Sequence, residues 1–228
     1  NGENMKIICL EEHYLDSELG RACMPVALEQ APFLGEGGKP SLMVIILTDS
    51  LLSRFNKLNV PLYLHPGLPL KSVQQAYFTG FSAEVNARLS MFAWGWHHEA
   101  GIHLLRLMLS GAFDKYPNLQ VISGHWGEML PFWLQRLDDS LPLAATGLSR
   151  TLTRTFQEHV YVTRHMLTLP HFQFIYALMG AERILFSVGY PYQTLDGVKT
   201  FIDSLPVNKA EKEAIAFRNA ERLLGITV

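Results

Sequence analysis

The sequence predicts an α/β fold of the (β/α) TIM-type barrel class, built as one domain over residues 1–228. Three observations support this class: short apolar runs recur along the chain, helical patterns lie between them, and polar residues follow the runs. Runs that are apolar at successive positions are typical of parallel strands covered by helices. The carboxyl ends of barrel strands form the active-site face, so the residues that follow these runs are the candidates for function.

Six segments have the composition of buried strands. They are residues 5–10, 42–47, 60–64, 119–122, 159–162 and 184–186. Apolar residues at helical spacing predict helices over residues 99–112 and 210–224. A closed barrel needs eight strands and usually about 250 residues, and this chain of 228 residues offers fewer of both. Prolines and glycines interrupt residues 20–41, so we expect a barrel that is shortened or incomplete between its first and fifth strands.

Composition and charge argue against several classes of partner. The 19 lysines and arginines nearly balance the 21 aspartates and glutamates, so no basic excess favours nucleic acid or an anionic membrane. The longest apolar run, residues 42–47, is far shorter than the ~20 residues that span a bilayer, and we expect neither a membrane span nor a secretory signal. Cys9 and Cys23 form neither a disulfide framework nor a metal motif, which favours a reducing, cytoplasmic location.

The proportion of charged residues bears on assembly. It is 18%, below the ~25% usual for soluble domains, while the apolar content is ordinary. A surface with few charges is suited to burial against another subunit. We therefore expect a homodimer or a homotetramer.

The ends of two predicted strands carry residues of metal-ligand type. Glu11 and His13 are two positions apart, so a strand places both side chains on the same side. His65 ends another strand and precedes a Pro-Gly turn. Carboxylate and imidazole together suit a divalent ion such as zinc or manganese, and three protein ligands leave positions open for substrate or water. Taken singly, each residue is equally compatible with a solvated acid or an ordinary loop histidine.

A second group of candidate residues follows the strand at 119–122. If a helix begins at His125, Glu128 can reach back to the imidazole and fix its tautomer, and an oriented histidine can act as acid or base or polarise a carbonyl. The alternative is that Glu128 only favours a helix N-terminus. Arg136, further along the same helix, can reach a substrate carboxylate or be an ordinary surface arginine.

Other motifs are weaker. His98 and His103 are five positions apart rather than four, which excludes a metalloprotease helix. The glycines at 35–38 lack the lysine of a phosphate-binding loop, and no Gly-x-Ser-x-Gly elbow supports a serine hydrolase. The aromatic residues at 92–96 and 132–133 have no basic companions, so we expect them in the core or an interface rather than in a base-stacking platform.

Taken together, several motifs resemble a known family. These are Glu11-Glu12-His13, Tyr63-Leu64-His65-Pro66, the stretch 99–131 with Gly124-His125-Trp126-Gly127-Glu128, and Ile184-Leu185-Phe186-Ser187 with Tyr190-Pro191. They are similar to the amidohydrolase-related metal-dependent decarboxylases, and most of all to the γ-resorcylate and related hydroxybenzoate decarboxylases. The resemblance covers the first strand and residues 59–226. It implies a TIM barrel, usually dimeric or tetrameric, with one divalent metal ion and no organic cofactor.

The resemblance also implies roles for single residues. Glu11, His13 and His65 correspond to metal ligands, and His125, supported by Glu128, corresponds to a residue that contacts the substrate. Arg136 matches an arginine that reaches the substrate carboxylate across a subunit interface.

Two departures from the family pattern are visible. The family's fourth metal ligand is an aspartate in Ser-x-Asp-Tyr/Trp-Pro, and it also protonates the ring carbon in the proposed mechanism; here Gly189 takes its place in Ser-Val-Gly-Tyr-Pro. The alternative is that His165, at the neighbouring strand end, or Asp196, seven residues downstream, has taken over the role of the aspartate, although neither lies at a matching strand-end position. Family members also carry about two more strand–helix units before the strand that ends at His65.

The leading functional hypothesis is a metal-dependent, non-oxidative decarboxylase of a hydroxylated aromatic carboxylic acid, a carboxy-lyase that binds a small aromatic carboxylate. Loss of the aspartate at Gly189 predicts weak metal binding and little turnover. The alternatives are a metal-dependent hydrolase of the same superfamily and a catalytically inactive homologue.

Overall fold

The computed structural model describes residues 6, 49–163, 168–189, 192 and 196–226. The predicted strands at 5–10 and 42–47 lie outside the described residues, apart from Lys6. The same holds for Glu11, His13 and His165, so their predicted positions are untested.

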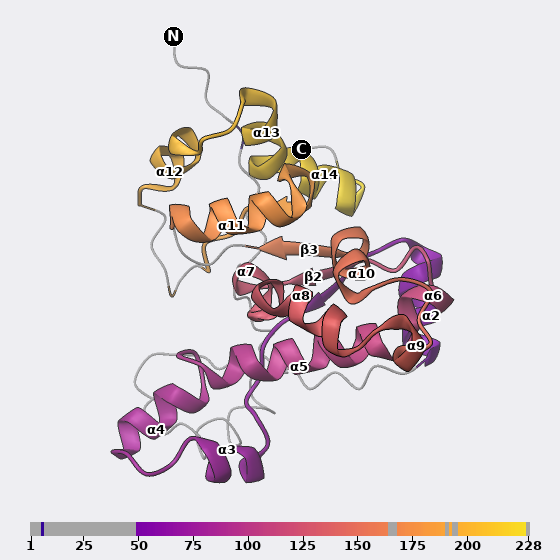
Figure 1. Cartoon of the computed structure of the whole chain (residues 1–228). Coiled ribbons are helices and arrows are strands. Elements are labelled where there is room, and N and C mark those ends of the chain that lie inside the picture. Colours follow the sequence, from indigo (N-terminus) through magenta and orange to yellow (C-terminus); the bar gives the residue numbers. More distant parts are fainter. Residues whose placement is uncertain (1–5, 7–48, 164–167, 190–191, 193–195, 227–228) are drawn as a thin grey trace.

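Four parallel strands form one sheet in the order β1-β2-β3-β4 (Figure 1). They are β1 (Leu62–Leu64), β2 (Val121–Ser123), β3 (Val160–Thr163) and β4 (Ile184–Leu185). The register pairs Leu62 with Val121, Val121 with Val160, and Val162 with Ile184. These strands confirm the four strand predictions that fall on described residues, and the described part of the chain supplies half of the strands of a closed barrel.

Helices connect the strands and follow them along the chain. In chain order they are α2 (Asp49–Leu58), α3 (Lys71–Tyr77), α4 (Ala83–Ser90), α5 (Gly95–Leu109), α6 (Ala112–Lys115), α7 (His125–Glu128), α8 (Leu130–Ser140), α9 (Leu143–Thr146), α10 (Leu152–His159), α11 (Leu169–Met179), the 3₁₀ helix η2 (Ala181–Arg183), α12 (Val198–Ser204), α13 (Lys209–Glu213), the π-helical η3 (Ala214–Arg218) and α14 (Asn219–Leu224).

Both predicted helices are present with shifted limits. Helix α5 begins four residues before the predicted start at 99, and the left-handed backbone of Gly111, with φ of 74°, separates α5 from α6. The predicted helix 210–224 corresponds to the uninterrupted run of α13, η3 and α14. It begins at a capping box in which Asn208 and Glu211 exchange hydrogen bonds.

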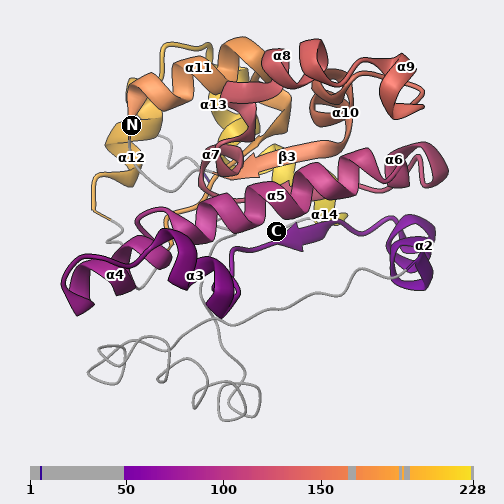
Figure 2. The same cartoon turned by 60° about the horizontal axis from the view of Figure 1, so that its bottom comes forward.

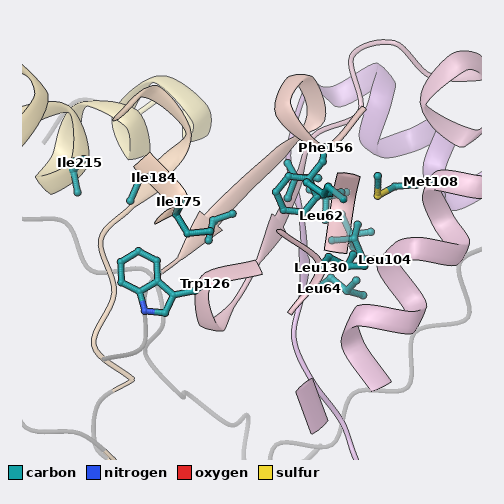
Figure 3. Packing of buried hydrophobic residues seen from close by; sticks show 14 of the residues in the cluster. Leu62, Leu64, Leu104, Met108, Trp126, Leu130, Phe156, Ile175, Ile184 and Ile215 are labelled. Atoms are coloured by element: carbon teal, nitrogen blue, oxygen red, sulfur yellow. The ribbon is translucent and has the colours of Figure 1, made fainter. Parts of the chain in front are cut away.

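The two faces of the sheet are buried by different elements. Alternate strand residues, such as Leu62 and Val160, belong to the main apolar core, which also contains residues of α5, α8, α10 and α11. Figure 3 shows Leu62, Leu104 and Phe156 close together, contributed by β1, α5 and α10. A smaller cluster on the other face contains Ile122, Tyr161, Leu185 and Ala220. Because both faces are apolar, the strands carry no alternation of polar residues, as expected for a buried parallel sheet.

Helix α5 brings together two segments that are distant in sequence. It runs alongside the sheet and brings the segment after residue 94 next to the short α7 (Figures 1 and 2). Among the described helices, none has both the length and the apolarity required to cross a membrane.

Candidate active site

Two histidines meet at the carboxyl ends of neighbouring strands. His65 directly follows β1, and His125 follows β2 after Gly124; their ring centroids are 6.1 Å apart. The His65 Nδ1 lies 2.9 Å from the carbonyl oxygen of Pro66, which can only accept, so Nδ1 carries the proton. The lone pair is then on Nε2. Metal-binding histidines commonly have this tautomer, because their second nitrogen donates to a backbone carbonyl or a carboxylate.

The backbone after β2 makes a single left-handed turn. The φ angles are 45° at His125, 62° at Trp126, 86° at Gly127, 53° at Glu128 and 66° at Met129. The sequence predicts an ordinary helix start here, and in this respect the prediction is wrong. A left-handed residue other than glycine costs about 1–2 kcal/mol, and backbone strain of this kind is concentrated at functional sites.

The turn places Glu128 between two imidazoles. Its Oε1 is 2.6 Å from the Nδ1 of His125, and its Oε2 is 2.8 Å from the Nδ1 of His97 on α5. The rings of His97 and His125 lie at 70° to each other with centroids 4.6 Å apart. The predicted contact between His125 and Glu128 is therefore present, although a different backbone conformation produces it.

His97 is the member of this cluster that the sequence does not predict. It lies 31 residues before Glu128, and no local motif or spacing rule connects the two positions. Its Nε2 is 2.9 Å from the carbonyl oxygen of Phe92, so both of its ring nitrogens are engaged.

Glu128 is buried, with only 1% of the residue exposed. Burial raises its pKa, but the charge of His125 and the hydrogen bonds from both histidines outweigh burial, and the pKa lies below its usual value. An ionised Glu128 accepts one hydrogen bond from each imidazole. The carbonyl oxygen of Phe92 can only accept a hydrogen bond, so the Nε2 atom of His97 donates to it.

These three side chains could also hold a metal ion. One ligand atom from each of His97, His125 and Glu128 lies within 4.8 Å of the others. In the hydrogen-bonded arrangement both carboxylate oxygens and both Nδ1 atoms are already used, so an ion here would have to replace two protons. The predicted set of Glu11, His13 and His65 has the same donor chemistry, but only His65 lies among the described residues.

A pocket of about 910 Å³ opens beside the cluster. His97, His125 and Glu128 line it together with aromatic side chains that include Phe92, Trp94, Trp126, Phe132, Trp133 and Phe174. Pockets of this size and apolar character are typical sites for small molecules, oriented by a few polar groups.

The aromatic pair on α8 is exposed rather than buried in the core. Phe132 is 73% exposed and Trp133 is 53% exposed. The expected core position is therefore wrong for this pair, and an interface position stays a prediction. Arg136 lies on the same helix, is also exposed, and makes no hydrogen bond or ion pair within the described part of the chain.

The segment after β4 contains Gly189, the position at which the resemblance implies a missing metal-ligand aspartate. Gly189 is buried and has a φ of 76°, in the left-handed region that favours glycine. Asp196, seven positions later, is exposed.

Comparison with known proteins shows the family to which the chain belongs. A family model described as Amidohydrolase matches residues 28–226. Decarboxylase orsB of Emericella nidulans is 34% identical over 185 residues, covering 78% of this chain and 56% of its own length. The γ-resorcylate decarboxylase of Polaromonas sp. is 35% identical over 178 residues, covering 74% and 52%. This chain therefore spans about half the length of the curated relatives it matches.

Two similar proteins with solved structures are also decarboxylases. A dihydroxybenzoic acid decarboxylase from Polaromonas sp., with bound manganese and the inhibitor 2-nitroresorcinol, superposes with a TM-score of 0.69 at 28% identity, covering 92% of this chain and 66% of that one. The 5-carboxyvanillate decarboxylase of Sphingomonas paucimobilis gives a TM-score of 0.70 at 27% identity, covering 78% and 53%. The described strands thus match part of the barrel of larger enzymes. The chain belongs to the amidohydrolase family.

Proposed function

We propose that this protein is a metal-dependent, non-oxidative decarboxylase of a hydroxylated aromatic carboxylic acid. The observation that carries the proposal is the cluster of His97, Glu128 and His125 in the wall of a pocket lined by aromatic side chains. An aromatic acid presents a flat apolar ring to such walls and polar groups to the imidazole. The relatives named for dihydroxybenzoate and γ-resorcylate decarboxylation supply the substrate class.

The reaction replaces a carbon–carbon bond with a carbon–hydrogen bond. The carboxylate leaves as carbon dioxide, and the ring carbon that held it gains a proton. With Nδ1–H donated to Glu128, the Nε2 lone pair of His125 accepts the proton of the hydroxyl next to the carboxylate. The buried carboxylate stabilises the resulting imidazolium, which then returns a proton to the ring carbon. The phenolate left after loss of carbon dioxide is protonated by water.

The residues that would hold the metal are Glu11, His13 and His65. The fit rests on the tautomer of His65, which leaves Nε2 as the coordinating nitrogen, and on the mixed carboxylate and imidazole donors, which suit manganese or zinc. If bound there, a metal ion would supply positive charge that stabilises negative charge on the substrate's oxygen atoms. His125 and the aromatic walls orient the ring.

Metal titration distinguishes the two candidate donor sets. The His65→Ala variant should lose at least the ~10–100-fold in Mn²⁺ affinity that removal of an outer-shell partner costs, measured by calorimetry. The His97→Phe variant should bind Mn²⁺ nearly as the parent does. A larger loss in His97→Phe than in His65→Ala would place the ion in the His97, His125 and Glu128 group instead.

The function is tested by following the ultraviolet absorbance of dihydroxybenzoates in the presence of Mn²⁺. We expect slow loss of substrate with release of carbon dioxide, and a fall of about 10²–10⁴-fold in the His125→Gln variant. The His103→Gln variant is the matched control, since His103 is an exposed residue of α5 that pairs with Glu99. Hydrolysis of an ester or amide without decarboxylation would favour the hydrolase alternative.

A further inference from the structure

A second, smaller pocket lies at the amino ends of the strands. It has a volume of about 270 Å³, and three of the residues that line it directly precede a strand: Pro61 before β1, Gln120 before β2 and Arg183 before β4. Arg222 of α14 also lines it. The candidate active site follows the strands, so the two pockets lie at opposite edges of the parallel sheet, and none of the roles argued above involves the second one.

The charged groups that line this pocket are two guanidinium groups. Among the described residues, no acidic side chain lines it. Arg222 forms an ion pair with Glu182, whose Oε2 lies 2.8 Å from Nη1 of the arginine. Glu182 therefore offsets the charge of Arg222, and the charge of Arg183 is left over.

Arg183 is a half-buried cation without an acidic partner. Its guanidinium carbon lies 4.6 Å from the centroid of the Tyr161 ring, and its Nη1 donates to Oε1 of Gln120 at 2.5 Å. A guanidinium group has five N–H donors. Within the described part of the chain, Arg183 makes no ion pair and no second side-chain hydrogen bond, so most of these donors are available to a ligand.

The charges around Arg183 favour an anion in contact with it. Burial lowers the pKa of the Arg183 guanidinium, the charge of Arg222 lowers it as well, and Tyr161 and Glu158 offset these effects only in part. Glu158 is not a counter-ion for Arg183, because it already pairs with Arg150 at 2.8 Å. A partly buried cation next to a second cation is stabilised when an anion binds between them.

We propose that this pocket binds a compact oxyanion of the phosphate type, held by Arg183 and Arg222. Two planar guanidinium groups can each bind a different pair of oxygens on a tetrahedral anion, and such charge-assisted hydrogen bonds are stronger than neutral ones. Asn59 and Asn118 add neutral donors: both are exposed at the pocket, and their side-chain amides make no hydrogen bond within the described chain. The bound anion would connect α14 to the amino ends of β2 and β4. This site is independent of the proposed decarboxylation.

The test is calorimetric titration of the full chain with inorganic phosphate. We expect Arg222→Met to weaken binding by about 10–100-fold, because a charge-assisted donor is lost. Asn118→Asp should weaken it by a similar factor, because a negative charge is added at an exposed position of the pocket. Arg218→Met is the matched control: it changes the net charge equally, and Arg218, four residues before Arg222, pairs with Glu213 and does not line the pocket.

Arg183→Met tests the central cation directly and should also lose phosphate binding. Arg183 packs on Tyr161, so the fold of this variant is checked by near-ultraviolet circular dichroism. If the variant does not fold, Arg222→Met and Asn118→Asp decide the question.

Two further ligands define the class of anion. Acetate should bind at least about 10-fold more weakly than phosphate, because a planar carboxylate engages one guanidinium group rather than two. Glycerol 3-phosphate distinguishes free phosphate from a phosphate group on a larger compound. Tighter binding of this ester than of inorganic phosphate would assign the larger compound.

Three results would overturn the proposal. They are phosphate binding that is as strong in Arg222→Met and Asn118→Asp as in the parent, acetate binding as tight as phosphate binding, and no binding to the parent at about 10 mM phosphate, where a site with a Kd near 1 mM would be occupied. Phosphate bound at the candidate active site would give the first of these results, because the variants do not alter that site. None of these titrations depends on decarboxylation, so the two proposals fail separately.

Discussion

At the scale of single residues, the site depends on a backbone conformation that few residues adopt. The left-handed turn from His125 to Met129 directs the side chains of His125 and Glu128 toward each other. Gly127 lies in the middle of this turn, and a Cβ atom there would be 2.6 Å from Cγ of Pro131 and 3.2 Å from Cζ of Phe156. The packing of the next helix against the turn therefore requires glycine at this position.

We expect Gly127→Ala to lower the free energy of unfolding by about 2–4 kcal/mol, because it combines left-handed strain with a steric clash. Gly147→Ala is the matched control: its φ of 70° imposes similar strain, but nothing lies within 4 Å of the added carbon. That control should cost about 1 kcal/mol. Urea denaturation of both variants measures the difference, and equal losses would contradict the packing argument.

At the scale of elements, a buried histidine at the end of α10 links stability to pH. His159 Nδ1 donates to the Leu119 carbonyl at 2.9 Å, and Nε2 lies 2.7 Å from Nη1 of Arg150, so the folded imidazole is neutral. Burial lowers its pKa, the bond to Leu119 raises it, and the charge of Arg150 lowers it, with a net lowering. The unfolded chain, with an ordinary histidine pKa of about 6.5, therefore takes up this proton more readily than the folded chain.

Stability should consequently decrease as the pH falls below about 6.5, until the folded pKa of His159 is reached. The His159→Asn variant keeps a donor to Leu119 and should have a smaller decrease between pH 8 and pH 5.5, measured by urea denaturation. Glu128 affects stability at lower pH than His159. Its pKa is lowered in the folded chain, so its contribution to the free energy of unfolding is lost only as the pH falls below about 4.5. An identical pH dependence in parent and variant would exclude His159 as a cause.

The strands and helices could be predicted from the sequence, whereas the left-handed turn and the position of His97 could not. Apolar runs and helical spacing are local properties, and they located the four described strands and the helices that begin at Gly95 and Lys209. The left-handed turn is not predictable in this way, since Trp126 and Glu128, which adopt it, have no preference for positive φ. The position of His97 depends on the packing of α5 against α7, a contact between segments distant in sequence.

At the scale of the whole molecule, the exposed aromatic pair on α8 predicts an interface. Phe132 and Trp133 are exposed, and Arg136 lies on the same helix without a partner in the described chain. We expect a dimer or tetramer at micromolar concentration in analytical ultracentrifugation, with an interface of about 2,000 Å² or more. The double variant Phe132→Ser, Trp133→Ser should shift the equilibrium toward monomer. A parent protein that sediments only as monomer would contradict this prediction.

The central claim is the proposal made above, a metal-dependent decarboxylase of a hydroxylated aromatic carboxylic acid, together with the hypothesis that Gly189 limits its turnover. The most direct test is the rate of carbon dioxide release from 2,6-dihydroxybenzoate with Mn²⁺, compared between the parent and Gly189→Asp. Aspartate tolerates the left-handed φ of 76° better than most residues, so the variant should fold. We predict Mn²⁺ affinity about 10–100-fold higher and a clear gain in turnover that His125→Gln abolishes. Turnover by the parent at an ordinary ~1–10³ s⁻¹, or no change in either quantity on substitution, would contradict the claim.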